Sequence, residues 1–364
     1  MKNTFGNNIS VTLFGESHGE AIGAVVDGLA PGIFIDTNAI DSYLARRRPS
    51  GAISTARKEA DEYRIVSGVF GGKTTGTPLC IIIPNKDTKS EDYSETRWLP
   101  RPSHADYSAN CKYHGFEDYR GGGHFSGRIT AALVAAGAII MSALNSKGIY
   151  IGTHLKKCAD IADRDFGDLS FDIQNLSQSS FPVLDADVAK LMQDKIIEAK
   201  ASGDSIGGIL ETAVIGLEAG LGEPWFDSVE SVLSHILFSV PGVKGVEFGA
   251  GFAISGMMGS MANDTFLMNE ERIETSTNNS GGINGGITNG MPLIFRCAMR
   301  PTPTIGKEQA TVDMLNLSDS VISAKGRHDP CIAHRACPVI DCVAALAIAD
   351  LLCGRFGTDW LADE

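Results

Sequence analysis

The sequence has no surplus of basic residues and no uncharged apolar run of membrane-spanning length. Its 31 Lys and Arg residues are outnumbered by 44 Asp and Glu residues, and the net charge of -13 repels nucleic acid and anionic membrane surfaces. The longest uncharged apolar stretch, 129–144, is shorter than the roughly 20 residues that a bilayer requires, so we expect a buried helix there. Residues 1–14 contain no apolar stretch of signal-peptide length. We therefore expect a cytoplasmic protein that binds neither nucleic acid nor a membrane.

The sequence also lacks a disulfide framework and any linker or repeat. Its eight cysteines are scattered, and several lie in apolar segments where a free thiol packs as a small hydrophobic group. With 364 residues, 43% of them hydrophobic, the chain can bury a large core. Because no Pro- or Ser-rich stretch separates two halves, we expect one α+β domain over 1–364. We expect this domain to be a β-α-β sandwich with Ala-rich helices buried between antiparallel sheets.

Hydrophobic patterns and caps predict both strands and helices. Short β-rich runs predict strands at 9–14, 21–26, 63–69, 78–83, 148–153, 206–215, 243–254 and 291–299. Capped or apolar segments predict helices at 36–47, 126–144, 185–200, 227–238 and 338–351. The first of these helices ends in Arg46, Arg47 and Arg48, and the simplest interpretation of this run is a solvated helix end. The polar stretch 85–120 has no clear period and predicts a functional loop.

Four short segments place a histidine among Gly, Pro or Ser residues. They are 15–19 (GESHG), 101–106 (RPSHAD), 121–128 (GGGHFSGR) and 326–330 (GRHDP). Turn-forming stretches of this kind usually present polar groups to a ligand. His18 and His104 can each donate or accept a proton near neutral pH, and Asp329 can orient a base or relay a proton. Together the segments predict an anion site with acid and base groups.

Two glycine clusters let a ligand approach the backbone. The triplet at 121–123 precedes a helix whose first turn Ser126 can cap, which is a suitable arrangement for phosphate, and Arg128 adds a fixed charge. It is not a P-loop, because no Lys-Ser or Lys-Thr pair follows at the required spacing. The second cluster, 280–287, precedes a strand and then the segment 300–304 (RPTPT). There a planar ligand could lie against glycine, with Arg300 near its anionic tail. Tight turns without a ligand are the alternative for both.

A zinc site is a competing interpretation of the C-terminal motif. His328, Cys331, His334 and Cys337 fall at every third position and are the ligand types that zinc prefers. Evenly spaced ligands beside Pro330 and Pro338 would not easily converge on one tetrahedron. We therefore expect no metal site.

Taken in order, these motifs resemble the chorismate synthase family nearly end to end. The segments that carry the resemblance are 15–19, 46–49 (RRRP), 67–70 (SGVF), 74–77 (TTGT), 101–106, 118–123 (DYRGGG), 243–247 (VKGVE), 281–287 and 326–331. The resemblance implies a lyase that converts 5-enolpyruvylshikimate 3-phosphate to chorismate and phosphate by trans 1,4-elimination. This is the last step of the shikimate pathway in aromatic amino acid biosynthesis. It also implies reduced FMN as cofactor and a homotetramer. The alternative is a non-catalytic flavin- or anion-binding protein.

The resemblance further implies roles for individual residues. His104 matches the acid beside the departing phosphate, His18 the group that protonates the reduced flavin, and Asp329 the carboxylate that assists proton removal. The matching substrate contacts are Arg47, Arg101, Ser126, Arg128 and Arg327. The matching flavin contacts are His124, Phe125, Ser126, Gly285, Arg300, Pro301, Thr302, Pro303, Thr304 and Arg327. His124 and Phe125 depart from the commoner Arg-Ser, so a titratable group replaces a fixed charge. Either NADPH or an external flavin reductase is implied as the source of reducing equivalents.

Overall fold

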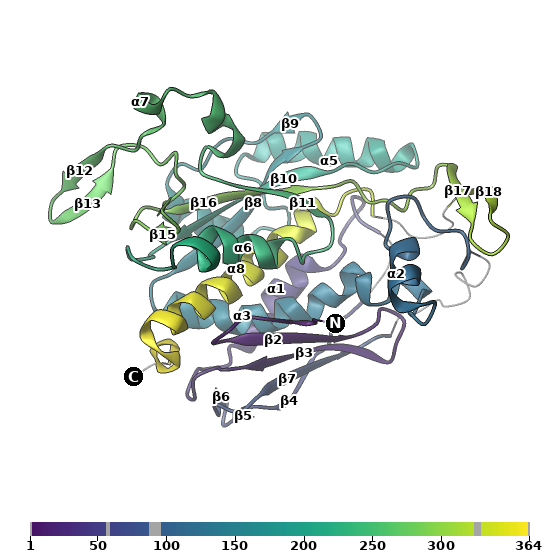
Figure 1. Cartoon of the computed structure of the whole chain (residues 1–364), viewed down its shortest axis with the longest axis horizontal. Helices are drawn as coiled ribbons and strands as arrows, with labels where there is room; N and C mark the ends of the chain where they lie inside the picture. Colours follow the sequence, from purple (N-terminus) through teal and green to yellow (C-terminus); the bar gives the residue numbers. More distant parts are fainter. Residues whose placement is uncertain (1, 56–58, 87–95, 324–328, 363–364) are drawn as a thin grey trace.

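Two five-stranded antiparallel sheets lie on either side of a group of helices in this computed structural model (Figure 1). The structure describes residues 2–55, 59–86, 96–323 and 329–362. The first sheet has the order β1-β2-β3-β7-β4, with β1 at Thr4–Phe5, β2 at Ser10–Gly15, β3 at Ala21–Asp27, β7 at Leu79–Pro84 and β4 at Arg64–Ser67. The second has the order β11-β16-β10-β8-β9, with β11 at Val243–Phe248, β16 at Leu293–Met299, β10 at Gly208–Ile215, β8 at Tyr150–Cys158 and β9 at Ile161–Ala162.

The strands form where the sequence alternates buried and less buried apolar residues. In β7, Leu79, Ile81 and Ile83 are fully buried, whereas the residues between them are half-buried. Successive side chains of a strand point to opposite faces of a sheet, so β7 turns one apolar face toward the helices. The antiparallel pairing of β2 with β3 makes 16–20 a hairpin connection, as the sequence predicted.

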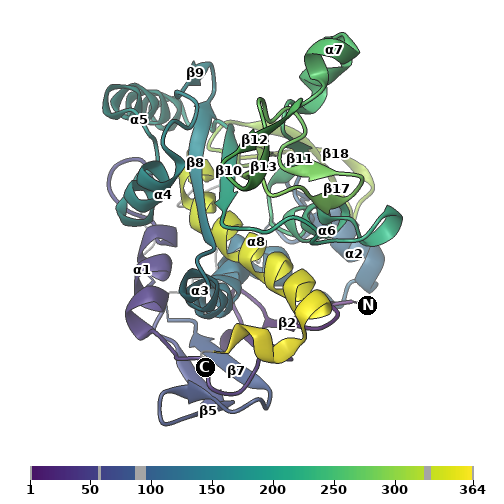
Figure 2. The ribbon, with the colours of Figure 1, turned by 90° about the vertical axis from the view of Figure 1, so that its left-hand side faces the viewer.

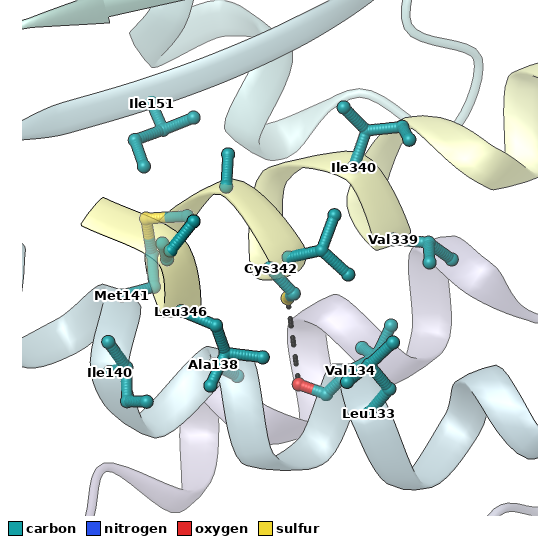
Figure 3. Close-up of a cluster of buried hydrophobic side chains, with 14 of the residues drawn as sticks. Leu133, Val134, Ala138, Ile140, Met141, Ile151, Val339, Ile340, Cys342 and Leu346 are labelled. Carbon is teal, nitrogen blue, oxygen red and sulfur yellow. Dashed lines mark hydrogen bonds between the residues drawn. The ribbon is translucent and has the colours of Figure 1, made fainter. Parts of the chain in front are cut away.

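Two Ala-rich helices fill the space between the sheets. Helix α3 (Thr130–Ser146) packs on β3 and β7, helix α8 (Ala333–Phe356) packs on β8 and β10, and the two helices pack on each other. Gly137 allows this close approach, because a Cβ there would overlap that of Cys342 and lie 2.8 Å from the Cys342 carbonyl oxygen. The Cys342 thiol donates to the Val134 carbonyl at 3.5 Å across the same contact (Figure 3).

The same two helices are long and apolar enough to cross a membrane by length and composition. In the most apolar 18-residue window of each helix, 83% of the residues within 127–146 and 94% of those within 333–356 are buried inside the protein. The expectation of a buried helix at 129–144 is therefore confirmed. Apolar residues that are already covered by protein on nearly all sides leave little surface for lipid.

The remaining elements surround this core (Figures 1 and 2). The other helices are α1 (Thr37–Arg47), α2 (Asp106–Tyr113), α4 (Leu169–Gln178), α5 (Ala186–Ala201), α6 (Val229–Leu237) and α7 (Gly259–Ala262). Small hairpins are formed by β5 (Val69–Phe70) with β6 (Lys73–Thr74), β12 (Phe266–Asn269) with β13 (Arg272–Thr275), β14 (Ile283–Asn284) with β15 (Ile287–Thr288), and β17 (Gln309–Asp313) with β18 (Ser318–Ile322). Helix α1 is capped by Asp36, whose carboxylate accepts from two backbone N–H groups.

Several predicted boundaries were wrong for identifiable reasons. The aperiodic stretch 85–120 contains α2, a short helix with almost no apolar face that hydrophobic periodicity does not reveal. The predicted strand 243–254 ends at Phe248, before glycine-rich 3-10 turns. Helix α8 begins five residues before Pro338, the predicted start, and includes this proline in its interior. Helix α4 was not predicted at all.

Candidate active site

A cavity of about 1070 Å³ opens where the N-termini of α3 and α8 approach the C-termini of α1 and α6. Its volume reaches the upper end of the ~300–1,000 Å³ of typical small-molecule sites. The predicted site residues that line it are His18, Arg47, Arg101, His104, His124, Phe125, Ser126, Arg128, Arg300, Pro301, Thr302, Pro303, Thr304 and Asp329. Arg327 lies outside the described residues. Residues from segments far apart in sequence thus share one cavity.

His18 is held by the glycine triplet at 121–123. The Ser17 N–H donates to the Gly123 carbonyl at 3.1 Å, and the Ser17 hydroxyl contacts the carbonyls of Arg120 and Gly121 at 3.3 and 3.2 Å. The same hydroxyl lies within hydrogen-bond distance of Nδ1 of His18, 3.1 Å away. The ring is consequently fixed in one orientation.

The glycine triplet makes room for two imidazoles. Gly121, Gly122 and Gly123 have φ values of 60°, 88° and 52°, a region that other residues seldom adopt. A Cβ on Gly121 would overlap the His18 ring, and a Cβ on Gly122 would lie 3.2 Å from Cε1 of His104. His18 and His104 therefore lie against adjacent residues of one backbone segment. The sequence predicted the triplet as a phosphate-binding turn, and this contact with the rings was not foreseen.

His104 belongs to a hydrogen-bonded group with Arg101 and Asp106. The His104 Nδ1 atom lies 2.6 Å from Oδ1 of Asp106, in the first turn of α2. Arg101 binds both oxygens of that carboxylate, at 2.7 and 2.8 Å. Burial alone would raise the pKa of Asp106, but hydrogen bonds from Arg101 and His104 hold it well below its ordinary value. The carboxylate is thus ionised and fixed between an imidazole and a guanidinium.

Arg46 and Arg47 are buried, so the expectation of a solvated helix end was wrong for both. The Arg46 side chain is 8% exposed and pairs with Asp341 of α8 at 3.3 Å. Arg47 donates from Nε to the Thr130 hydroxyl at 2.9 Å and from Nη2 to the Gly127 carbonyl at 3.0 Å. These partners come from distant segments, which is why the sequence could not pair them.

A buried carboxylate, Asp61, collects three arginines of the site. Its side chain is fully buried and pairs with Arg47 at 3.2 Å, with Arg48 at 3.5 Å, and with Arg128. Burial would raise the pKa of Asp61, but the three guanidiniums outweigh it and lower the pKa. Sequence reasoning missed Asp61, because nothing in its local acidic stretch distinguishes it from a surface residue.

Asn85 connects Arg128 to the turn that carries His18. Its amide oxygen accepts from Nε of Arg128 at 3.0 Å, and its amide nitrogen donates to the carbonyls of Glu16 and Gly19, both at 2.9 Å. Asn85 directly follows β7 and was also missed, since a single asparagine after a strand carries no sequence signal. Asp61, Arg128 and Asn85 together fix the His18 turn against the arginine cluster.

Asp329 lies beside the arginine cluster. Its carboxylate accepts from the Thr55 N–H at 2.9 Å and pairs with Arg335 of α8. Arg335 also donates from Nε to the Arg47 carbonyl at 2.9 Å. Asp329 is consequently connected through Arg335 to the end of α1.

The described residues that were predicted to hold a flavin occupy the cavity, with one exception. His124 donates from Nδ1 to the Gly15 carbonyl at 2.8 Å, and Arg300 donates to the Ser103 carbonyl at 2.7 Å. The Thr302 hydroxyl is buried and has no hydrogen-bond partner among the described residues. Gly285 does not line the cavity, because the turn between β14 and β15 packs near the start of α6, away from the cavity.

Of the residues in the competing zinc interpretation, Cys331 interacts with His334 and with Cys158, and the others have further contacts. The His334 Nε2 atom lies 3.4 Å from the Ser54 hydroxyl, and the Cys337 thiol donates to the Ala333 carbonyl of its own helix at 3.6 Å. His328 lies outside the described residues. Within the described ranges, no group of three or more His, Cys, Asp or Glu side chains is arranged to hold a metal ion.

Both the sequence and the fold of this chain are similar to those of known proteins. A sequence model of the family described as chorismate synthase matches residues 9–353. The chorismate synthase of Thermococcus kodakarensis is 42% identical over 96% of this chain and 97% of its own length, and that of Aeropyrum pernix is 42% identical over 100% and 96%. A crystal structure of chorismate synthase, 27% identical, superposes with a TM-score of 0.76 over 97% of this chain and 94% of that chain. Motif order, overall sequence and fold coincide, and the chain belongs to the chorismate synthase family.

Proposed function

We propose that this protein catalyses its family's reaction, the conversion of 5-enolpyruvylshikimate 3-phosphate to chorismate and phosphate. The observation that carries the proposal is the pair His18 and His104, which lie against the adjacent glycines 121 and 122 in a cavity lined by arginines. The reaction needs positive charge for a phosphate ester and proton donors or acceptors near the ring, and this cavity supplies both. The positive lining is local, because the whole chain has a net charge of -13.

The cavity residues divide into anion-binding and proton-transferring groups. We assign substrate-anion binding to Arg47, Arg101, Ser126, Arg128 and Arg327. His104 would donate a proton to an oxygen of the departing phosphate. Asp329 would assist removal of the ring proton, and His18 would hold a proton on the flavin side of the cavity. Asp61 already orients Arg47 and Arg128 before an anion binds. Little side-chain entropy is therefore lost when the anion binds.

The residues present fit reduced FMN, the cofactor of the family. The cavity is large enough for two ligands of moderate size, and the buried Thr302 hydroxyl lacks a protein partner among the described residues. We assign FMN binding to His124, Phe125, Ser126, the segment 300–304 and Arg327. When bound, reduced FMN supplies electron density that helps phosphate leave.

Reducing equivalents come from NADPH used by the protein itself or from an external flavin reductase. An assay with NADPH as the sole reductant separates these two sources.

We also propose that residues 1–364 act as one cytoplasmic domain with a β-α-β sandwich architecture. Support comes from the packing of α3 on the first sheet, of α8 on the second, and of the two helices on each other. A chain that shares one helical core between both sheets has no natural division into two units.

A projecting arm supports self-association into the homotetramer. The arm consists of residues 249–278, which include α7 and the β12–β13 hairpin and extend from the body of the protein (Figures 1 and 2). Its large apolar side chains are 66% to 83% exposed at Phe252, Met258, Met261, Phe266, Met268 and Ile273. Several large apolar side chains exposed on one projecting segment are a common feature of interaction sites. Gly285 lies outside the cavity of its own chain. In the homotetramer it would contact the flavin bound to a neighbouring copy.

Light scattering after size-exclusion chromatography tests the role of the arm. We expect a tetramer for the wild type and a smaller species for a variant with Phe252→Ser and Met258→Ser, because polar side chains weaken an apolar interface. The matched control is Phe116→Ser, since Phe116 is 91% exposed and lies outside the arm. A tetramer in all three proteins would overturn the assignment of the arm.

A direct assay tests the proposed activity. The protein is mixed anaerobically with 5-enolpyruvylshikimate 3-phosphate and dithionite-reduced FMN, and chorismate and phosphate are measured together. We expect both products in equal amounts. The alternative, a non-catalytic flavin- or anion-binding protein, would bind FMN and release neither product, and that result would refute the enzyme proposal.

A further inference from the structure

Asp106 has no assigned role, yet it makes the most direct contact with His104. We propose that Asp106 is a positioning residue that orients the His104 ring toward the cavity and keeps it in the protonated form that an acid requires. The inference deepens the proposed function and rests on it, because His104 is the group assigned to the departing phosphate. The evidence consists of the ring's orientation, the fixation of the carboxylate and the charges nearby.

The hydrogen bonds define which way the ring faces. An ionised carboxylate can only accept, so the 2.6 Å contact between Oδ1 of Asp106 and Nδ1 of His104 places a hydrogen on Nδ1. The opposite nitrogen, Nε2, faces the glycine triplet, because a Cβ on Gly122 would lie 3.2 Å from Cε1 and 3.3 Å from Nε2. The edge of the ring that carries Nε2 does not contact Asp106 and lies at the cavity wall. A second proton on Nε2 can be transferred from this edge.

The carboxylate itself cannot turn away from the ring. Arg101 contacts it three times, through the backbone N–H at 3.0 Å, through Nε at 2.8 Å and through Nη2 at 2.7 Å. Asp106 also lies in the first turn of α2, so its backbone is part of a helix. Its side chain is 20% exposed, which leaves the pair only partly screened by water. Asp106 therefore holds His104 in a fixed direction.

Several cations lie near His104, and Asp106 is the group that can offset them. Nη2 of Arg101 lies 3.1 Å from Nδ1 of His104, and a guanidinium at that distance opposes protonation of the imidazole. Arg300 approaches from the end of β16, with its guanidinium on the Ser103 carbonyl at 2.7 Å. On the loop that supplies Gly122, Asp118 and Arg120 are paired with each other at 2.8 Å. Asp106 is the carboxylate in direct contact with the ring, and it offsets the nearby cations.

The substitution Asp106→Asn tests the inference, because asparagine keeps the shape and removes the charge. A reaction that needs protonated His104 loses activity as the pH rises and the ring loses its proton. A carboxylate stabilises the protonated ring and so moves this loss to higher pH. Without the charge, we expect the alkaline limb of the kcat profile to shift to lower pH by about 1–3 units. At neutral pH, kcat should fall at least tenfold, with a smaller change in KM.

A second readout does not depend on turnover. The His104 ring signals are followed by NMR from pH 5 to 9 in the wild type, in Asp106→Asn and in the control Asp172→Asn. Asp172 is also bound by both nitrogens of an arginine, Arg164, at 2.6 and 2.9 Å, but it does not line the cavity. We expect the midpoint of the His104 titration to move to lower pH in Asp106→Asn and to stay at the wild-type value in Asp172→Asn.

The outcomes separate the inference from the function on which it rests. If wild-type protein makes no chorismate, the proposed function fails, while the NMR midpoint still reports on Asp106. If the wild type is active and Asp106→Asn shows an unchanged midpoint and pH profile, Asp106 has a purely structural role and the inference is overturned. Thermal unfolding of each variant identifies any loss of activity that comes from misfolding.

Discussion

Replacing His104 or His18 by alanine is expected to reduce kcat for chorismate formation by about 10²- to 10⁴-fold, the usual contribution of a positioned acid or base. Both rings line the cavity and lie against adjacent glycines, so alanine removes a proton-transferring group and leaves the backbone unchanged. The affinity for FMN, measured by fluorescence quenching, should change far less than kcat. A protein that only binds flavin would have no turnover to lose.

The matched control for these variants is His114→Asn. His114 is exposed at the other end of α2 and adopts φ 57°, a conformation that asparagine tolerates. It does not line the cavity, so its replacement should leave kcat unchanged. Equal kcat values for His104→Ala and His114→Asn would show that His104 takes no part in proton transfer.

Asp61→Asn is expected to destabilise the folded protein by about 3–5 kcal/mol, the typical cost of removing one partner from a buried ion pair. The physical reason is that the buried Arg47 and Arg128, together with the partly exposed Arg48, would lose their common counter-ion. Asparagine is chosen because Asp61 has φ 50°, which asparagine also accepts, so the backbone contributes little to the loss. The free energy of unfolding in urea measures the effect.

The neighbouring residue provides the control and the pH provides a second test. Glu62 pairs with Lys86 at the surface, and Glu62→Gln should unfold at the wild-type urea concentration.

Because the folded-state pKa of Asp61 is lowered, its stabilising contribution is present above the unfolded carboxyl pKa of about 4 and is lost as the pH falls through the folded value. Asp61→Asn should therefore be less sensitive to acid than the wild type. Unfolding midpoints that coincide at neutral pH would contradict the role given to Asp61.

Local patterns in the sequence predicted much of this arrangement. The runs at 9–14 and 21–26 are short, β-rich and joined by a glycine-flanked turn, and they form the hairpin that carries His18. Ser126 caps the turn that enters α3, where its hydroxyl accepts from the Arg128 N–H at 3.3 Å. Signals of this kind involve neighbours in sequence, so they can be read without knowledge of the fold. The roles assigned to the site residues remain predictions.

The contacts that orient the site join residues distant in sequence, and these could not be predicted. Asp61 meets Arg128 across 67 positions, and Arg46 meets Asp341 across 295. An arginine at the end of a helix has the same local sequence whether it faces water or a buried carboxylate, so the more common solvated state was the reasonable expectation. Asn85 and Asp106 were overlooked as orienting groups because their function depends on which loops lie next to them.

The crossing of α3 and α8 has a consequence for how this chain can vary. Gly137 and Cys342 occupy a single shared volume, since a methyl group at 137 would overlap Cys342. A smaller side chain at 342 would not relieve this overlap, because the added carbon would still lie 2.8 Å from the Cys342 carbonyl oxygen and 2.9 Å from its Cα. Position 137 can therefore hold a residue larger than glycine only if the two helices move apart, whatever happens to the chemistry at the far end of the same helices.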